Sequence, residues 1–475
     1  MSSTMFHRSL KPPIIETIPL LKKKLKPKVW MEAYGCSASM ADSEMITGLL
    51  KEAGYEIATK QSESTLNLIV TCSVKDTTEH RMVSRIRTMT KSGKPLIVAG
   101  CLPKADRAKV ELLSSSASLI GPNCIDKAPD AARLALTGGR LVALKDSPID
   151  KINIPRVRLN SVVSIVEIAS GCMSECTFCQ TKIAKGWLRS YRIGDIVRQI
   201  KSDIKSGCKE VWLSSTDNGC YGRDIDTNLV ELLKECCSIE GSFKIRVGMM
   251  NPMYLPAIRD GMVSLFCEND KLFKFLHIPV QSGSDRVLKK MKRGHSSKTF
   301  MDAAHAFRAK IPEMTISTDI IAGFPSETGD DFQETIDLLE KSQPDIVNIS
   351  RYAARPGTEA YRWKGIRVNS QLSKKRSESL HALTRRIAKK RNSLWQDWQG
   401  EIVIDEIGKV RQGRNYAYKP VVISPPPPPL SSSSSTTTRA TTTITAADRE
   451  ISLGDKVHVK IYDFSNFSLK AKIIL

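Results

Sequence analysis

The segment GCMSECTFCQ holds three cysteines, Cys172, Cys176 and Cys179, in the spacing C-x-x-x-C-x-x-C; we call them the loop trio. Three thiolates on one short loop can ligate three irons of a cubane 4Fe-4S cluster and leave the fourth iron open to a small molecule. A structural zinc site takes four ligands, usually in two separated pairs, and no histidine lies near this loop in the sequence. The spacing therefore predicts an iron–sulfur cluster with an open coordination position.

A second set of three cysteines is recognised only once the strands are predicted. Cys36, Cys72 and Cys101, the sheet trio, follow the predicted strands WMEAYG, LNLIVT and PLIVAG. The carboxyl ends of neighbouring parallel strands meet at one crevice, so these thiols are expected to converge. This favours a second cluster with an open iron, with zinc bound by three thiolates and a water as the alternative. The other six cysteines show no ligand pattern and are expected to be core or surface thiols: Cys124, Cys208, Cys220, Cys236, Cys237 and Cys267.

Strand and helix patterns alternate along most of the chain, which predicts an α/β fold with parallel sheets flanked by helices. From 29 to 140 the alternation is typical of an open parallel α/β sheet domain. From 158 to 392 a longer series of strands ends at polar, glycine-rich or cysteine-bearing loops, as in a complete or partial (β/α) barrel. The active face of such a barrel lies at the carboxyl ends of its strands.

The last part of the chain has a different pattern. A basic helix is expected over 371–395, and its lysines and arginines form either a solvated face or a surface for nucleic acid. Short strand-like runs over 393–475 predict a small all-β domain, interrupted at 424–446 by a low-complexity stretch that is expected to be a disordered loop. The apolar side of the helix is expected to carry Leu372, Leu380, Leu383, Ile387 and Leu394.

The chain is strongly basic. Its 475 residues include 72 Lys and Arg against 50 Asp and Glu, a formal net charge of +22, which favours RNA or DNA as a partner. Residues 1–28 are basic and interrupted by prolines; they are expected to form a flexible arm and lack the apolar centre of a secretory signal. No segment reaches the roughly 20 apolar residues of a membrane helix. Twelve cysteines are too sparse for a disulfide scaffold, so a reducing, cytoplasmic location is expected.

The loop trio, with Phe178 before its last cysteine, resembles the signature of the radical S-adenosylmethionine superfamily. Both trios together resemble the methylthiotransferases of that superfamily, whose N-terminal domain carries a second 4Fe-4S cluster. Long segments look most like the archaeal and eukaryotic branch that acts on N6-threonylcarbamoyladenosine beside the tRNA anticodon. The C-terminal domain is similar to TRAM, a small RNA-binding barrel. The segments include AYGCSASMADSEMITGLL, FLHIPVQSGSDRVLKKMKRG and TDIIAGFPSETGDDFQET.

The resemblance implies a mechanism with two 4Fe-4S clusters. In that family the cluster on the loop trio binds S-adenosylmethionine, and its reduction yields a 5′-deoxyadenosyl radical. The cluster on the sheet trio holds the sulfur that becomes a methylthio group at C2 of the adenine at position 37. Both open irons must face one water-poor cavity, because otherwise radical and sulfur are lost to side reactions. The implied partners are the anticodon stem-loop of tRNA and an electron donor such as a ferredoxin or flavodoxin.

Polar residues at the strand ends of the expected barrel are candidates for binding the amino-acid and ribose parts of S-adenosylmethionine. Each is equally suited to capping a helix or bonding a loop. Three arginines are candidates for binding substrate phosphate or carboxylate, or for surface ion pairs. The polar candidates are Ser215, Thr216, Asp217, Gln281 and Ser282, where Thr216 replaces a longer residue of the family pattern, and the arginines are Arg189, Arg192 and Arg355.

Two other functions are compatible with the same motifs. One is methylthiolation of a different target, either isopentenyl-modified adenosine in tRNA or an aspartate of a ribosomal protein. The other is a non-catalytic iron–sulfur protein that binds RNA and senses redox state. The open iron expected at both trios favours an enzyme over a sensor.

Overall fold

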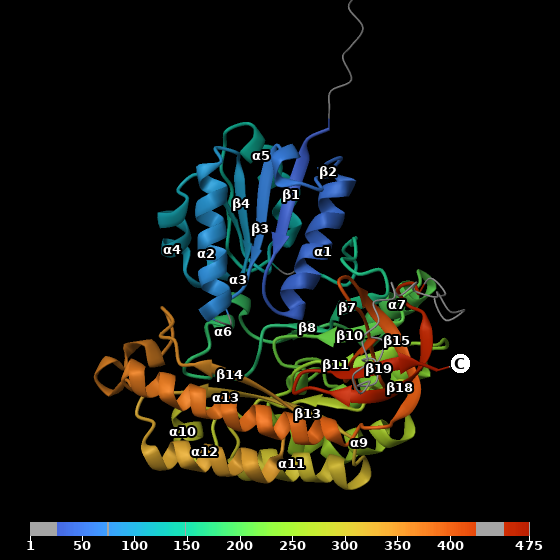
Figure 1. The fold of residues 1–475 in the computed structure, drawn as a ribbon. Coiled ribbons are helices and arrows are strands. Elements are labelled where there is room, and N and C mark those ends of the chain that lie inside the picture. Colours follow the sequence, from blue (N-terminus) through green and yellow to red (C-terminus); the bar gives the residue numbers. More distant parts are fainter. Residues whose placement is uncertain (1–25, 74–75, 148, 424–450, 475) are drawn as a thin grey trace, which may run out of the picture.

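The computed structural model describes residues 26–73, 76–147, 149–423 and 451–474. It has three parts that follow one another along the chain: an N-terminal sheet domain, a central partial barrel and a C-terminal β-barrel (Figure 1). The arm expected at 1–28 lies outside the described residues up to residue 25, and the insert expected at 424–446 lies wholly outside them.

The N-terminal domain is a six-stranded parallel sheet with the strand order β2-β1-β3-β4-β5-β6. Its two long inner strands, β3 and β4, are buried along their whole length, which agrees with their mostly apolar sequences LNLIVT and LIVAG. This confirms the predicted open parallel sheet. The strands are β1 (Lys28–Ala33), β2 (Glu56–Ile57), β3 (Leu66–Thr71), β4 (Leu96–Gly100), β5 (Ser118–Ile120) and β6 (Val142–Ala143), and the helices are α1 (Ser37–Glu52), α2 (Asp76–Lys91), α3 (Cys101–Ala105), α4 (Arg107–Leu113) and α5 (Ala128–Leu136).

The central part has two parallel three-stranded sheets, with the orders β11-β10-β7 and β12-β13-β14. A bridge between Ile245 and Leu272 joins them into one open, six-stranded barrel, as the sequence predicted. Its strands are β7 (Val163–Glu167), β10 (Glu210–Ser214), β11 (Lys244–Val247), β12 (Phe275–His277), β13 (Thr315–Ala322) and β14 (Ile346–Arg351), with a small ribbon of β8 (Ala169–Ser170) and β9 (Arg189–Ser190). Its helices are α6 (Gln180–Lys185), α7 (Ile193–Lys205), α8 (Leu229–Ser238), α9 (Leu255–Glu268), α10 (Asp285–Lys290), α11 (Ser297–Lys310) and α12 (Gly329–Ser342).

The long basic helix α13 (Ser370–Ser393) packs against β14 and α12. Leu380, Leu383 and Ile387 are buried, but Leu372 and Leu394 are exposed, so the predicted apolar side was wrong at both ends. The buried face of α13 runs instead through Ser373, Leu380 and Asn392, so Leu372 lies off this face and Leu394 follows the end of the helix. Two basic residues also turn inward to buried carboxylates: Arg376 bonds Glu327 at 2.6 Å, and Arg391 bonds Asp345 at 3.1 Å.

The C-terminal part is a closed five-stranded barrel with the order β15-β16-β17-β19-β18, consistent with the predicted TRAM fold. It packs against the beginnings of the central strands. Tyr418 lies among Phe273, Phe275 and Trp212, and Lys419 bonds Asp345 at 2.9 Å. The strands are β15 (Gln399–Ile407), β16 (Arg411–Arg414), β17 (Pro420–Ile423), β18 (Lys456–Phe464) and β19 (Leu469–Ile473).

In the described part of the chain, no helix combines the length and the apolar character needed to span a membrane.

A buried carboxyl lies inside the central barrel, next to the C-terminal one. Glu210 is fully buried; its Oε2 accepts a hydrogen bond from Trp212 Nε1 at 3.0 Å, and its Oε1 has no described partner. Burial, reinforced by the nearby carboxylate of Asp405, raises the pKa of Glu210 from 4.5 to about 7. Protonated Glu210 therefore suits this interior better than ionised Glu210.

Replacing Glu210 should change how stability depends on pH. Because the pKa of Glu210 is raised on folding, the folded state binds more protons than the unfolded state between pH 4.5 and 7, and stability falls as pH rises through this window. At pH 8 we expect Glu210→Gln to be more stable than the parent by about 1–3 kcal/mol, and at pH 4 the difference should shrink. Urea unfolding at both pH values measures this, with exposed Glu268→Gln as the control. A pH dependence that Glu210→Gln leaves unchanged would contradict it.

Candidate active site

The sheet trio lies at the carboxyl ends of three neighbouring strands. Cys36 is the residue before α1, Cys72 follows β3, and Cys101 is the first residue of α3. Because β1, β3 and β4 are adjacent in the sheet, their ends bring the three cysteines to one edge. Cys72 and Cys101 are buried, whereas Cys36 is exposed. The structure thus brings together three residues that are far apart in the sequence.

Two glycines permit this approach. Gly35 has a φ of +117°, and a Cβ at this position would lie 2.3 Å from the Cβ of Cys72. Gly100 has a φ of +93°, and its Cβ would lie 2.4 Å from the carbonyl oxygen of Thr71. Any larger residue would push the strand ends apart. A hydrogen bond with the Cys72 thiol lowers the pKa of Cys36 well below its ordinary value.

The loop trio lies between β8 and α6, at the carboxyl end of the central barrel. The backbone N–H of Ser174 donates to Cys172 Sγ at 3.3 Å, and Arg293 Nη1 donates to Cys176 Sγ at 3.2 Å. Cys179 is the residue before α6, and burial raises the pKa of its thiol to about 11. No sequence pattern indicates Arg293, which comes from a loop more than one hundred residues later.

Cys172 has two further neighbours. Its Sγ, a carboxylate oxygen of Asp217 and the Sγ of Cys220 lie within 4.8 Å of one another. A hydrogen bond with the Cys220 thiol lowers the pKa of Cys172 to about 6, and burial raises the pKa of Asp217 to about 7. Cys220 was expected to be a thiol without a ligand pattern. It instead lies beside the loop trio, because a short 3-10 helix (Asn218–Cys220) carries it there directly after the end of β10.

Three cofactor candidates lie together after β10. Asp217 accepts the backbone N–H groups of Gly219 and Asn251, each at 3.0 Å. Ser215 Oγ bonds Asn218 Oδ1 at 2.5 Å, so it fixes the loop. Thr216 Oγ1 is buried and has no hydrogen-bond partner among the described residues, so its hydroxyl is available to donate and accept a hydrogen bond.

Gln281 and Ser282 follow β12. Gln281 has a φ of +77°; its N–H donates to the carbonyl of Asp319, and its own carbonyl accepts from Ile321. Ser282 Oγ accepts the N–H of Ser284 at 3.2 Å at the start of α10. Ser282 is therefore engaged in ordering its own loop, which was the alternative role predicted for it.

The three arginine candidates lie in different places. Arg189 donates to the carbonyl of Ile149, and Arg192 is exposed at the start of α7. Arg355 is buried and paired with Glu79 of α2, so it joins the central part to the N-terminal domain. Of the three, Arg355 alone is among the described residues that line the chamber reported below.

The two trios are held close together by a buried group of four charges. Lys151 bonds Asp42 at 2.5 Å and Glu167 at 3.0 Å, while Lys185 bonds Glu167 at 2.9 Å. All four side chains are at most 2% exposed. Asp42 belongs to α1 beside Cys36, and Lys185 ends the helix that begins after Cys179. Burial opposes the charge of Lys185, yet the two carboxylates raise its pKa well above the ordinary value.

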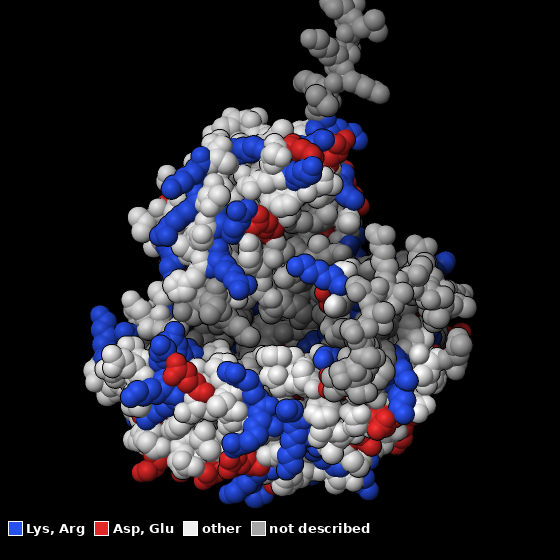
Figure 2. Space-filling model, viewed as in Figure 1, with Lys and Arg blue, Asp and Glu red and all other residues white. Residues whose placement is uncertain are grey.

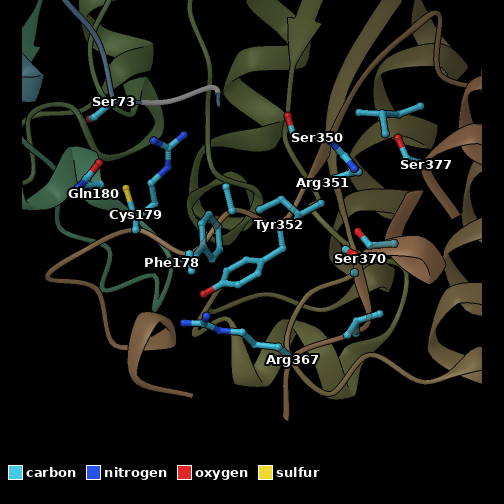
Figure 3. A pocket seen from close by; sticks show the side chains of 18 of the residues that line it. Ser73, Phe178, Cys179, Gln180, Ser350, Arg351, Tyr352, Arg367, Ser370 and Ser377 are labelled. Atoms are coloured by element: carbon cyan, nitrogen blue, oxygen red, sulfur yellow. The ribbon is translucent and has the colours of Figure 1, made fainter. Parts of the chain in front are cut away.

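A chamber of about 700 Å³ opens where the domains meet. Cys179 and Phe178 of the loop trio's segment line it, as does Ser73, the residue after Cys72 (Figure 3). Contacts between α3, which begins with Cys101, and α6, which follows Cys179, close the junction. The volume of the chamber is in the range of sites that bind small molecules and nucleosides. The chamber thus adjoins segments that carry members of both trios.

Two family descriptions match the chain: "Radical SAM superfamily" over residues 166–339 and "Uncharacterized protein family UPF0004" over residues 28–121. A Pyrococcus horikoshii protein named probable threonylcarbamoyladenosine tRNA methylthiotransferase is 39% identical over 385 residues, which cover 80% of this chain and 89% of that protein. The chain belongs to the threonylcarbamoyladenosine tRNA methylthiotransferase family.

Eukaryotic members of the family are similar as well. The threonylcarbamoyladenosine tRNA methylthiotransferase of Drosophila melanogaster is 33% identical over 94% of this chain and 78% of its own length. The human protein of the same name is 35% identical over 78% of this chain and 63% of its own length. Among solved structures, the radical S-adenosylmethionine methyltransferase TsrM of Kitasatospora setae superposes with a TM-score of 0.51 at 12% identity, covering 71% of this chain and 74% of that one. The likeness to TsrM concerns the fold alone.

The four buried charges predict that removing one of the two lysines destabilises the folded protein strongly. Lys151→Met leaves Asp42 without its 2.5 Å partner in the interior, so we expect a loss of about 3–5 kcal/mol in the free energy of unfolding. Lys298→Met removes an exposed pair with Asp302 and should cost less than about 1 kcal/mol. Denaturant unfolding of both variants measures the difference. Equal losses would show that the four charges do not stabilise the domain junction.

Proposed function

We propose that this chain is a tRNA methylthiotransferase that inserts a methylthio group at C2 of N6-threonylcarbamoyladenosine at position 37, next to the anticodon. The observation that carries the proposal is the convergence of the two cysteine trios on one domain junction, beside a chamber of about 700 Å³. The names of the archaeal and eukaryotic relatives support this reaction and this modified base.

The donor sets fit two 4Fe-4S clusters. Each trio supplies three thiols, one fewer than the four irons of a cubane, and thiolate donors suit iron–sulfur clusters. Cys172, Cys176 and Cys179 would hold one cluster, and the sheet trio would hold the other. When bound, the two clusters and S-adenosylmethionine supply the electron, the carbon-centred radical and the sulfur that no side chain provides.

Two residues around the loop trio have distinct proposed roles. Arg293 donates a hydrogen bond to Cys176 Sγ and so orients this proposed iron ligand. Thr216 Oγ1, buried without a described partner, is suited to bonding the amino or carboxylate group of S-adenosylmethionine. Asp217 and Gln281 remain proposed contacts for the same cofactor.

Basic residues lie on both sides of the chamber. Figure 2 shows lysines and arginines over the N-terminal domain around α2 and over α13, and α13 itself lines the chamber through Ser370, Ser373 and Ser377. With the net charge of +22, this surface is suited to the phosphates of an anticodon stem-loop. The base would have to leave the loop stack to reach the chamber. The exposed basic residues on α2 and α13 are Arg81, Arg87, Lys91, Lys374, Lys375, Arg385, Arg386, Lys389 and Lys390.

A further partner and a location follow from the reaction. Cleavage of S-adenosylmethionine requires one electron from outside the protein, so we propose a small electron carrier such as a ferredoxin or flavodoxin. A tRNA substrate and reduced thiols favour the cytoplasm. The relatives' names favour threonylcarbamoyladenosine over isopentenyl-modified adenosine or a protein aspartate.

Nucleoside mass spectrometry of tRNA tests the proposed function. Expression of this chain in cells that lack such an enzyme should produce 2-methylthio-N6-threonylcarbamoyladenosine, with a corresponding loss of the unmodified precursor. A protein with Cys172, Cys176 and Cys179 all changed to Ala is the control. A methylthio group on isopentenyladenosine alone, or on no nucleoside, would contradict the proposal.

Single cysteine variants should separate the roles of the trios. Anaerobically reconstituted Cys176→Ala should hold about half the parent's iron and form no 5′-deoxyadenosine, because its loop trio is broken. Cys72→Ala should lose a similar amount of iron, keep some cleavage of S-adenosylmethionine and form no methylthio product. Exposed Cys267→Ala is the matched control and should behave as the parent. Full product from Cys72→Ala would remove the sheet trio from the mechanism, and a redox sensor would form no 5′-deoxyadenosine in any variant.

A further inference from the structure

The chamber beside the loop trio is positively charged and lacks acidic residues. None of the described residues that line the chamber is Asp or Glu. Three arginines and a histidine do line it: Arg351, Arg355, Arg367 and His381. The charge of Arg355 is balanced by Glu79. Among the described residues, no carboxylate lies within 4.0 Å of Arg351 or Arg367. Two guanidinium groups thus border a cavity with no anion of the described chain beside them.

Arg367 lies next to a second unused donor. The hydroxyl of Tyr352 is buried and has no hydrogen-bond partner among the described residues. Figure 3 shows the side chain of Arg367 extending beneath the hydroxyl end of the Tyr352 ring. Burial raises the pKa of Tyr352, and the positive charge of Arg367 partly offsets this, which agrees with their proximity. Together they present an ionic donor and a neutral donor at one end of the chamber.

Both side chains are held in place. The ring of Phe324 packs edge-on against Tyr352 with centroids 5.4 Å apart, and Phe178 packs on Phe324 at 6.1 Å. Arg367 Nη2 donates to the carbonyl of Tyr361 at 2.7 Å, and its guanidinium lies 5.8 Å from the Tyr361 ring. Most of the donors of Arg367 remain available. The pair is therefore preorganised to bind an anion that enters the chamber.

The two tRNA bases considered above differ in charge. The threonylcarbamoyl group ends in a carboxylate, whereas the isopentenyl group is an apolar hydrocarbon. A guanidinium and a hydroxyl suit a carboxylate and would be left unpaired beside a hydrocarbon. We propose that Arg367 and Tyr352 bind the carboxylate of the threonylcarbamoyl group and so select this base; the inference rests on the proposed function.

The arrangement of the chamber supports this assignment. In Figure 3 the Phe178 ring lies between Cys179 and the hydroxyl end of Tyr352. A base whose C2 faces the cysteine side can therefore direct its N6 substituent past Phe178 toward Arg367. Arg351 lies at a different side of the same chamber, near Ser377 of α13, which forms part of the basic surface. Arg351 is thus suited to an RNA phosphate, and it provides a matched comparison.

Binding measurements with two RNAs test the proposal. One is an anticodon stem-loop that carries threonylcarbamoyladenosine, and the other carries the same group with its carboxylate converted to a neutral amide. The full-length parent should bind the carboxylate RNA about tenfold more tightly, as expected for one charge-assisted contact of about 1.4 kcal/mol. Arg367→Gln should bind both RNAs equally and lose affinity only for the carboxylate RNA. Tyr352→Phe should reduce the preference in part.

The variant Arg351→Gln distinguishes binding of the base's carboxylate from binding of an RNA phosphate. Arg351→Gln should lower the affinity for both RNAs by the same factor and keep the tenfold preference for the carboxylate RNA. It should also reduce the salt dependence of binding. Thermal unfolding of each variant checks that it remains folded, and the neutral Arg367→Met replaces Arg367→Gln if that variant does not. An equal loss for both RNAs in Arg367→Gln, or a parent without preference, would overturn the inference. In that case methylthiolation of the carboxylate RNA by the parent would leave the proposed function intact, whereas failure of the parent to modify it would contradict the function itself.

Discussion

The buried ion pairs among Asp42, Glu167, Lys151 and Lys185 are the interaction on which the arrangement of the site depends. They join α1, which begins after Cys36, to the helix that begins after Cys179. Two lysines and two carboxylates in a dry interior are stable only when all four are present, because any one left alone is a buried, unpaired charge. The domains are therefore fixed at a separation that places both trios at one junction.

The positions of the chamber and of the C-terminal barrel limit how an RNA substrate can lie on the protein. The open partial barrel ends at β14, and α13 packs against that strand, so the chamber lies along the open side of the barrel. The closed C-terminal barrel packs against the opposite ends of the strands, around Phe273 and Tyr418. An RNA that contacts both the chamber and the C-terminal barrel must therefore extend along the central part. The helix α13 offers basic residues along that path (Figures 1 and 2).

The arginines show how packing divides residues of one type into different roles. Arg376 and Arg391 neutralise buried carboxylates, and Arg355 joins two domains through Glu79. Arg351 and Arg367 have no such partner among the described residues and border the chamber. A sequence shows five similar cations, but only the positions of the carboxylates decide which of them can bind a ligand.

The sequence by itself determined the fold class and indicated the six cysteines of the candidate site. Local spacing was sufficient for the loop trio, and regular strand patterns placed each member of the sheet trio at a strand end, since parallel strands align their carboxyl ends. Tertiary structure decided what depends on distant segments: the approach of Arg293 and Cys220 to the loop trio, the paired state of Arg355, and the meeting of Tyr352 with Arg367. These contacts join residues whose separation along the chain carries no periodic signal, so only the packed domains could reveal them.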